Sequence, residues 1–328
     1  MLYKNTKRIK EDISVLGIGC WNFGGDWETS DERSADRIIR TAVDLGINLF
    51  DVAPVYGWFQ AEKILGQTLK DANLRDKVIV ASKCGLTWGD DHVTANDLSK
   101  ENLFKEIDGS LLRLQTDYID IWQLHWPDHN TPIEETCEAL SEIKKSGKIK
   151  YIGLSNFAQK DMVKFDQLVG VDVQQSLYNM FERNATSYHN IPLEYKTEQE
   201  VLPNVKKYGQ AFLPYSPLFQ GLLTGRFSKN KNLSKSDIRN ENPKLSGDKL
   251  EIYLDGYEKL EAFSKEIGHP TNEIVINWLR QIPEVTSIIG GVSSVKQLKK
   301  NIDALRWDLN ENEIERINEI IEPFRLMP

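Results

Sequence analysis

The feature that most constrains the fold is a regular alternation of short apolar segments with segments of helical periodicity. Eight apolar segments are expected to be strands, because they are rich in β-branched or aromatic residues and are apolar throughout, as strands buried on both faces are. They are VLGIGC (15–20), INLFD (47–51), KVIVASK (77–83), YIDIWQLH (118–125), YIGLS (151–155), VDVQQ (171–175), AFLPYS (211–216) and TSIIGG (286–291).

Helices are predicted between these strands. In residues 34–46 the apolar side chains recur on one face and Gly46 marks the end. Residues 131–148 are expected to begin with Thr131 as a cap and Pro132 in the first turn, and to end at Gly147. Residues 272–282 show the same helical pattern.

Eight strand–helix units running in one direction predict an α/β fold, a (β/α)8 TIM barrel with its helices outside. The barrel is expected to form a single domain over residues 1–328. A doubly wound sheet is the alternative. It is disfavoured because no G-x-G-x-x-G follows the first strand.

Bulk properties exclude several classes of protein. A net charge of -8 argues against a nucleic-acid surface as the main role. The three cysteines are odd in number and far apart, which favours a reducing cytoplasm over a disulfide framework. No signal peptide is expected from the charged N-terminal stretch, and no membrane partner is expected because no apolar run approaches about 18 residues.

Two long connections interrupt the alternation, at about 181–200 and 228–249. Connections of this length are uncommon in compact domains. The second one follows the seventh strand and is strongly polar. The sequence leaves two interpretations open for it, a polar segment without a role or a mobile lid over a ligand.

Polar residues gather where the predicted strands end, which is the face that carries function in such barrels. Asp51 ends the second strand, Tyr56 follows it, Lys83 ends the third strand and His125 the fourth. Further polar strand ends are Ser155, Asn156, Gln175, Tyr215 and Ser216. Each residue alone has a structural explanation, such as turn chemistry or a surface lysine. Their joint occurrence favours a site.

The four residues Asp51, Tyr56, Lys83 and His125 suit proton transfer at a carbonyl. A phenol exchanges protons poorly at neutral pH, but a nearby ammonium is expected to lower its pKa. The carboxylate would keep the lysine charged, and the histidine would align the substrate oxygen. Metal-binding patterns such as HExxH are absent, so no metal site is expected.

The sequence resembles the aldo-keto reductase family. The segments that carry the resemblance are FDVAPVYG (50–57), ASKCG (81–85), LHWPD (124–128), GLSNF (153–157), QSLYN (175–179), YSPLFQGLLTGRF (215–227) and GVSSVKQLKKN (291–301). The resemblance covers about residues 10 to 310. It implies a (β/α)8 barrel that binds NAD(P)H without a Rossmann fold, with Tyr56 as general acid or base, tuned by Lys83 and Asp51.

The resemblance also implies a set of cofactor-binding residues. Ser155, Asn156 and Gln175 would hold the nicotinamide carboxamide, and Tyr215 would stack on the ring. The others would contact the ring or pyrophosphate (Trp21, Asp51, Ser216, Pro217, Leu218, Gly221, Leu223 and Arg226) or hold the adenosine end (Gly291, Ser293, Ser294, Gln297 and Asn301).

The adenosine end bears on the choice of cofactor. The segment from Gly291 opens a helix, and helix N-termini bind anions. Many relatives carry Lys or Arg there for the 2′-phosphate, whereas this chain has Ser293 and Ser294, which supply no charge. By family habit NADP(H) is expected, with Arg226 and Lys296 as helpers, and use of NAD(H) is also plausible.

Aromatic residues dominate the loops on the substrate side: Trp21, Phe23, Trp27, Trp58, Trp88 and Trp126. Aromatic faces pack against sugars and against flat ketones. Because polar residues accompany them, a hydroxylated or sugar-like carbonyl is the preferred small-molecule substrate.

Two other functions are kept open. One is a Schiff-base lyase or aldolase with Lys83 as nucleophile. The other is a non-catalytic nucleotide-sensing subunit, like potassium-channel β subunits. The sequence leaves the oligomeric state open between a monomer and a small homo-oligomer.

Overall fold

Eight parallel strands lie side by side in the order β13-β10-β9-β8-β5-β4-β3-β14 in this computed structural model, which describes residues 1–25, 32–228 and 237–327. They are β3 (Leu16–Gly19), β4 (Leu49–Asp51), β5 (Ile79–Cys84), β8 (Ile119–Leu124), β9 (Ile149–Ser155), β10 (Val173–Leu177), β13 (Ala211–Tyr215) and β14 (Ile288–Gly291). The first and last strands of this order, β13 and β14, also adjoin. The Thr286 amide, just before β14, donates to the Phe212 carbonyl of β13 at 2.9 Å. The predicted (β/α)8 barrel is therefore confirmed, with all eight predicted strands.

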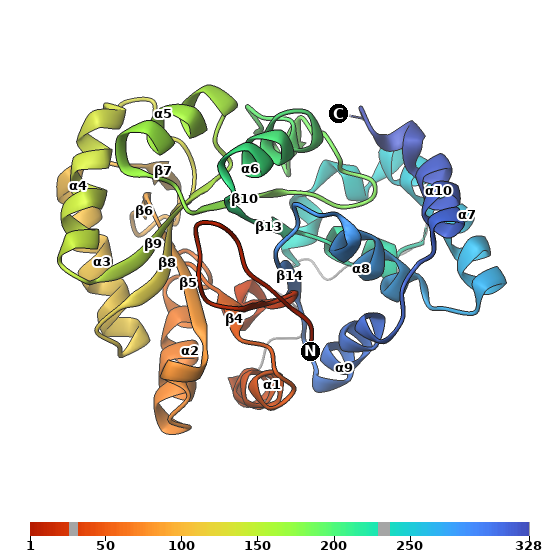
Figure 1. Ribbon diagram of the computed structural model, residues 1–328, viewed down its shortest axis with the longest axis horizontal. Helices are drawn as coiled ribbons and strands as arrows, with labels where there is room; N and C mark the ends of the chain where they lie inside the picture. The colour runs from red at the N-terminus through yellow and green to blue at the C-terminus, as the bar shows by residue number, and fades with distance from the viewer. Residues whose placement is uncertain (26–31, 229–236, 328) are drawn as a thin grey trace.

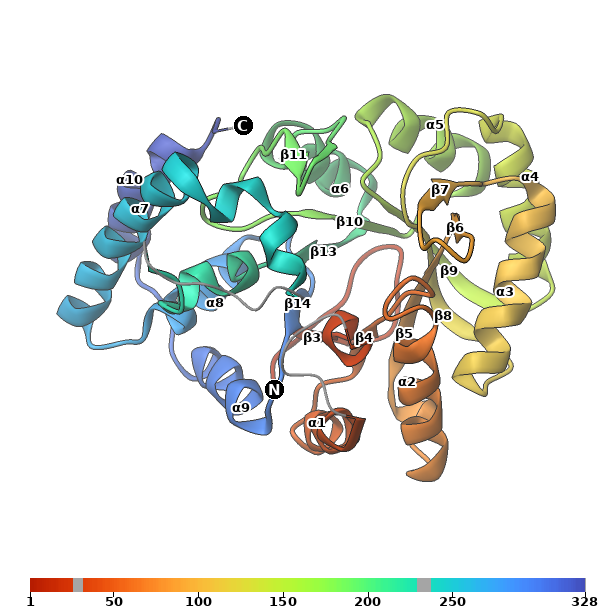
Figure 2. The same cartoon turned by 180° about the vertical axis from the view of Figure 1, so that it is seen from behind.

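Helices surround this sheet on the outside (Figures 1 and 2). They are α1 (Glu32–Asp44), α2 (Gln60–Asp71), α3 (Lys100–Leu114), α4 (Ile133–Lys145), α5 (Gln159–Val169), α6 (Leu202–Tyr208), α7 (Gly247–Ile267), α8 (Thr271–Gln281), α9 (Val295–Asp303) and α10 (Glu311–Ile321). Most of the buried apolar side chains form one cluster that includes residues of both the strands and the helices. Among the described residues, no helix combines the length and apolar character needed to span a bilayer.

The three helices predicted with bounds are present, with small differences at their ends. Gly46 has φ +88 and follows α1, which matches its expected role as a terminator. The expectation that Thr131 caps α4 is wrong. The residue before α4 is Pro132, and the Thr131 hydroxyl donates instead to Asp128 at 2.6 Å.

A second, smaller apolar cluster fills the barrel interior. Ile9 and Ile13 join inward-facing strand residues there: Leu49, Ile79, Ala81, Ile121, Val173, Ala211, Leu213 and Ile289. Ile13 belongs to the hairpin of β1 (Tyr3–Lys4) and β2 (Ile13–Ser14), which the sequence analysis did not predict. The red N-terminal segment crosses the middle of the barrel in Figure 1. This end of the barrel is therefore closed, so a ligand site is expected at the opposite end.

Loops and short hairpins lie over the opposite end, which faces the viewer in Figure 2. One hairpin is β6 (Leu86–Trp88) with β7 (Thr94–Asn96), and the other is β11 (Ser187–Tyr188) with β12 (Ile191–Pro192). The second hairpin lies inside the predicted loop 181–200, so that segment is partly ordered into strands. The predicted loop 228–249 contains two short 3-10 helices, and α7 already begins at Gly247; residues 229–236 lie outside the described part.

Candidate active site

The four predicted catalytic residues meet at one end of the barrel. Asp51 is the last residue of β4 and Lys83 the next-to-last of β5, while His125 directly follows β8. Tyr56 lies in the turn after β4. Its neighbour Gly57 has φ +58 and approaches the backbone of Gly24 so closely that an added Cβ would lie 2.0 Å from the Gly24 carbonyl oxygen. Only glycine fits there, and this contact fixes the turn that carries Tyr56.

The Lys83 ammonium forms the centre of the group. It donates to Asp51 Oδ2 at 2.7 Å, to the Tyr56 hydroxyl at 3.1 Å and to the Val52 carbonyl at 3.3 Å. The Lys83 side chain is 0% exposed and that of Asp51 3% exposed. Because a buried charge requires a partner, the pair keeps Lys83 charged and points it at the phenol oxygen.

The second carboxylate oxygen of Asp51 is held by two amides. Gln175 donates to Oδ1 at 2.8 Å and Gln123 at 3.3 Å. The predicted role of Gln175 toward a carboxamide is untested, and its side-chain nitrogen is engaged with Asp51. Sequence reasoning missed Gln123, which is fully buried. The signal was present, since Gln123 lies two residues after the inward-facing Ile121 and strand side chains alternate.

The Tyr56 phenol is held in its neutral form. Burial raises its pKa well above the usual value, and the Asp51 carboxylate adds to the effect. The expectation of a lowered phenol pKa is wrong for this structure, because burial outweighs the effect of the nearby Lys83 charge. A neutral phenol that accepts a hydrogen bond from an ammonium directs its own proton outward, which suits a proton donor.

His125 is neutral at physiological pH. Burial lowers its pKa well below the usual value, and the Lys83 charge acts in the same direction. Its ring lies edge-on to that of Tyr56, with 6.1 Å between centroids. A neutral imidazole carries one N–H donor and one acceptor nitrogen, so it can align a substrate oxygen beside the phenol.

Asn156 connects the predicted cofactor residues after β9 and β13. Its side-chain oxygen accepts from the hydroxyls of Tyr215 and Tyr195, each at 2.9 Å. Its nitrogen donates to Ser155 Oγ at 3.1 Å and to the His125 carbonyl at 3.2 Å. The structure thus brings Ser155, Asn156 and Tyr215 together. It places them next to His125, and sequence reasoning missed Tyr195.

The segment after β13 carries several of the residues predicted to bind the cofactor. Ser216 has φ +57 and Gly221 φ +98, and both lie on a run that turns sharply and includes Pro217 and Leu218. Leu223 is fully buried and its amide donates to the Leu218 carbonyl at 3.2 Å, whereas the Arg226 side chain is exposed. Several amides bond within the run itself: that of Phe219 donates to the Ser216 carbonyl at 2.9 Å and that of Gly221 to the Leu218 carbonyl at 2.9 Å. The predicted role of this run toward a pyrophosphate is untested.

The N-terminus of α9 is capped by its own residues. Ser294 Oγ accepts from the Gln297 amide at 3.2 Å, and Gln297 Oε1 accepts from the Ser293 amide at 2.8 Å and from Ser293 Oγ at 3.0 Å. The nearby Asn301 is largely buried. A Cβ added at Gly291 would meet no atom within 4 Å, so there is open space beside it. The predicted role of this terminus toward the adenosine end of a dinucleotide is untested, and the amides of Ser293 and Gln297 are bonded within it.

The predicted aromatic residues divide into two groups. Trp21 stacks on Tyr56 with 5.9 Å between ring centroids, and so belongs to the site. The rings of Trp58 and Trp88 pack with 5.3 Å between their centroids, and Trp58 also stacks on His92 with 4.1 Å between centroids.

Two further predicted aromatic residues, Phe23 and Trp126, pack in or against the core. Phe23 is 6% exposed and packs in the core, which leaves it little surface for a substrate. Trp126 packs against the same core, and Trp27 lies outside the described residues.

The β11–β12 hairpin adds two residues that sequence reasoning missed. The His189 ring lies 6.2 Å from that of Trp21, and the Tyr188 ring 5.1 Å from that of Tyr215. Burial lowers the pKa of His189 to about 4, helped by the Lys244 charge. The long segment between β10 and β13 therefore forms a wall of the site. Length alone was the signal for it.

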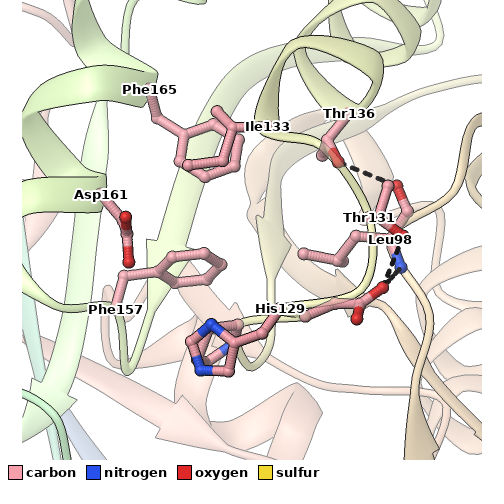
Figure 3. A pocket seen from close by; sticks show the side chains of 10 residues that line it. Leu98, His129, Thr131, Ile133, Thr136, Phe157, Asp161 and Phe165 are labelled. Carbon is pink, nitrogen blue, oxygen red and sulfur yellow. Dashed lines mark hydrogen bonds between the residues drawn. The ribbon is translucent and has the colours of Figure 1, made fainter.

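A cavity of about 150 Å³ lies elsewhere, between the loop after β8 and the first turns of α4 and α5 (Figure 3). Its lining is Leu98, Pro127, Asp128, His129, Thr131, Ile133, Thr136, Phe157, Asp161 and Phe165. None of the four predicted catalytic residues lines it. Among the described residues, no group of three or more His, Cys, Asp or Glu side chains is arranged to hold a metal ion.

Comparison with known proteins agrees with this fold. The model of the aldo/keto reductase family matches residues 15–322. The chain is 34% identical to the aldo-keto reductase YhdN of Bacillus subtilis, over 95% of this chain and 91% of that protein. It is 32% identical to a probable voltage-gated potassium channel subunit beta of Oryza sativa, over 93% and 91%.

A solved structure is similar over nearly the whole chain. It is the glycerol dehydrogenase of Gluconobacter oxydans, with a TM-score of 0.86, 30% identity, and coverage of 99% of this chain and 97% of that one. The family match extends from the first barrel strand past the last one, and the fold agrees over nearly the whole chain. The chain therefore belongs to the aldo/keto reductase family of oxidoreductases.

Proposed function

We propose that this protein is an NAD(P)H-dependent oxidoreductase that reduces an aldehyde or ketone to the alcohol, or runs the reverse reaction, with Tyr56 as the general acid or base. The observation that carries the proposal is the contact of the Lys83 ammonium with both Tyr56 and Asp51, at 3.1 and 2.7 Å. This contact supports Tyr56 as the group that gives and takes the proton, with Lys83 as the charge beside it.

A nicotinamide held at this site would supply the hydride that the carbonyl carbon needs for reduction. The Tyr56 hydroxyl donates its proton to the carbonyl oxygen, so that the C=O double bond becomes an alcohol. Lys83 stabilises the phenolate that forms, and Asp51 keeps Lys83 charged. Neutral His125 donates a hydrogen bond that aligns the same oxygen. In oxidation the phenolate takes the proton back.

The residues proposed to hold the cofactor are those predicted from the resemblance. Ser155, Asn156 and Gln175 would hold the nicotinamide amide with Trp21 and Tyr215 beside the ring. The backbone after β13 would take the pyrophosphate, and the N-terminus of α9 the adenosine phosphate. NADP(H) is the proposed cofactor. The neutral Ser293 and Ser294 support use of NAD(H) as well.

The proposed substrate is a small hydroxylated carbonyl or the corresponding polyol. Trp21 supplies an aromatic face next to Tyr56, and such faces pack against the C–H groups of sugars. Similarity to a glycerol dehydrogenase supports the same choice. A Schiff-base role for Lys83 is disfavoured, because a lysine held charged by a carboxylate at 2.7 Å is a weak nucleophile.

A second candidate is a non-catalytic nucleotide-sensing subunit, which the similarity to a potassium channel subunit favours. NADPH and NADH oxidation against a panel of aldoses, ketoses and aromatic aldehydes separates the two. Turnover of hydroxylated carbonyls supports the proposed enzyme. Tight cofactor binding without turnover of any carbonyl would favour the sensing subunit, and turnover of aromatic aldehydes alone would contradict the substrate class.

A further inference from the structure

A second buried ion pair lies beside the site, formed by Glu182 and Lys244. Lys244 Nζ lies 3.0 Å from Glu182 Oε1, and the two side chains are 1% and 3% exposed. Glu182 follows β10, whereas Lys244 lies in the short 3-10 helix Pro243–Leu245 before α7. The pair thus joins two loops that are more than 60 residues apart in the sequence.

Both charges make further hydrogen bonds to the loops around the site. Lys244 also donates to the carbonyl of Ser187, the first residue of the β11–β12 hairpin, at 2.8 Å. Glu182 Oε2 accepts from Asn179 at 2.8 Å, and the same Asn179 nitrogen donates to the carbonyl of Ser216 at 3.1 Å. One ion pair therefore holds the start of the hairpin and, through Asn179, the turn after β13.

The two held segments form the wall that would face the nicotinamide. Tyr188 follows Ser187 and its ring contacts that of Tyr215, the residue before Ser216. His189 comes next and its ring contacts that of Trp21. The charges are close to this wall: burial raises the pKa of Tyr215, and the Glu182 carboxylate is among the groups that add to the effect.

A pair of this kind is a poor source of stability. Removing two charges from water costs several kcal/mol, and well-packed apolar residues often stabilise a fold equally well. What the pair supplies is geometry, because each charge has fixed hydrogen-bond partners at known distances. Lys244 is bonded to the backbone carbonyl of Ser187, and Glu182 to the side-chain amide of Asn179, which itself donates to the Ser216 carbonyl.

We propose that Glu182 and Lys244 are positioning residues that hold the nicotinamide side of the site in its binding shape before the cofactor arrives. The inference rests on the proposed function, since it assumes that Tyr215 and its neighbours face the cofactor. Neither residue touches the reacting atoms. Their loss is therefore expected to weaken cofactor binding while the chemical step at saturating cofactor is retained.

The test compares dissociation constants for NADPH, measured by quenching of tryptophan fluorescence, with kcat at saturating cofactor. Glu182→Gln, Lys244→Met and the charge-neutral double variant are each compared with the unmodified protein. The matched control is Asp120→Asn. Asp120 is also buried and paired, with Arg75 at 2.8 Å, but it lies at the start of β8, at the opposite end of the barrel.

The inference predicts that Kd for NADPH rises about tenfold or more in the Glu182 and Lys244 variants, which corresponds to one lost charge-assisted contact. It also predicts that kcat changes less than about threefold, whereas the control loses thermal stability without a change in Kd. Unchanged Kd in the three variants would overturn the inference. An equal rise in Kd for the control would also overturn it, because the effect would then be one of general stability.

The single variants leave a buried charge unpaired and are at risk of misfolding. A measurement on the unmodified protein keeps the inference testable. Hydrogen exchange of residues 178–189 and 215–223 is predicted to be slow already without cofactor and to slow little further with NADPH. Fast exchange there that becomes slow only with NADPH would contradict a preformed wall.

The same data separate failure of the inference from failure of the proposed function. If the unmodified protein binds neither NADPH nor NADH, the proposed function is wrong. If it binds and turns over while the variants bind normally, the function stands and the positioning role of Glu182 and Lys244 does not.

Discussion

The ammonium of Lys83 lies 3.1 Å from the hydroxyl oxygen of Tyr56, inside a barrel end where Lys83 itself has no exposed surface. A buried cation directed at a phenol oxygen stabilises the phenolate more than the phenol. Burial meanwhile keeps the phenol protonated at rest. The two effects together favour a group that holds its proton until a substrate takes it.

Replacement of the cation should therefore remove most of the turnover. Lys83→Met is expected to lower kcat by about 10²-fold or more, because a positioned proton transfer typically contributes a rate factor of this size. It is also expected to destabilise the fold by about 3–5 kcal/mol, because the Asp51 carboxylate is left buried and unpaired. Steady-state kinetics and denaturant unfolding measure the two effects.

A double variant separates stability from chemistry. Asp51→Asn combined with Lys83→Met removes both charges and should recover much of the lost stability, while turnover stays low. Recovery of turnover together with stability would show that Lys83 acts only as a structural partner of Asp51.

The pH profile of carbonyl reduction should be flat where an ordinary histidine titrates. Burial and the Lys83 charge hold the pKa of His125 well below its usual value. Its neutral form is therefore fully populated from about pH 8 to pH 6, since an unperturbed histidine titrates near 6.5. The value of kcat/KM is expected to stay constant over this range. A loss of activity with a midpoint near 6.5 that is absent in His125→Gln would contradict a neutral His125.

Glu106 should make the protein less stable as the pH rises. It accepts a hydrogen bond from the Gly85 amide at 2.5 Å, and burial raises its pKa from 4.5 to about 8. Because the folded-state pKa lies above the unfolded one, its contribution to stability is complete below about pH 4.5 and is lost as the pH rises through about 8.

Glu106→Gln keeps an acceptor for the amide of Gly85 but cannot ionise. At pH 8.5 this variant is expected to be more stable than the unmodified protein by at least about 1 kcal/mol, and near pH 4.5 the two should be alike. Denaturant unfolding at both pH values measures this. The exposed Glu138→Gln serves as the control and should show no such pH dependence. Equal stability of Glu106→Gln and the unmodified protein at pH 8.5 would show that Glu106 ionises normally.

The preference for NADPH should increase when charge is added beside α9. Ser293 is the better site for this, since Ser294 caps the helix and its loss costs about 1 kcal/mol. Ser293→Arg is expected to raise the preference for NADPH over NADH by about tenfold, measured as the ratio of the two Kd values, because a guanidinium pairs with a phosphate. The uncharged Ser293→Gln is the control. An equal change for both cofactors would place the 2′-phosphate elsewhere.

The barrel could be predicted from the sequence because its strands are apolar on both faces and its helices show clear periodicity. The gathering of Asp51, Lys83 and His125 followed from topology alone, since parallel strands end at the same side of a barrel. Thr131 was assigned a capping role that the structure does not show, because a competing hydrogen bond to Asp128 in the same loop has no sequence signature.

Other parts of the site depend on tertiary contacts that the sequence does not display. Gln123 lies among apolar strand residues and shows its role only once the inward-facing positions of the barrel are known. Tyr188 and His189 come from a hairpin that is held near Trp21 and Tyr215 by an ion pair between residues far apart in the sequence. The pKa of Tyr56 was expected to be lowered by Lys83, but burial outweighs the charge, and burial can be judged only in the folded protein.

The Tyr56→Phe variant tests the proposed proton donor most directly, because it removes one oxygen and keeps the ring stacked against Trp21. NADPH binding is measured by fluorescence, and reduction of a carbonyl substrate is followed as NADPH oxidation. Kd for NADPH is expected to stay within about threefold while kcat falls by about 10²-fold or more. Turnover equal to that of the unmodified protein, with the same cofactor affinity, would contradict Tyr56 as the proton donor.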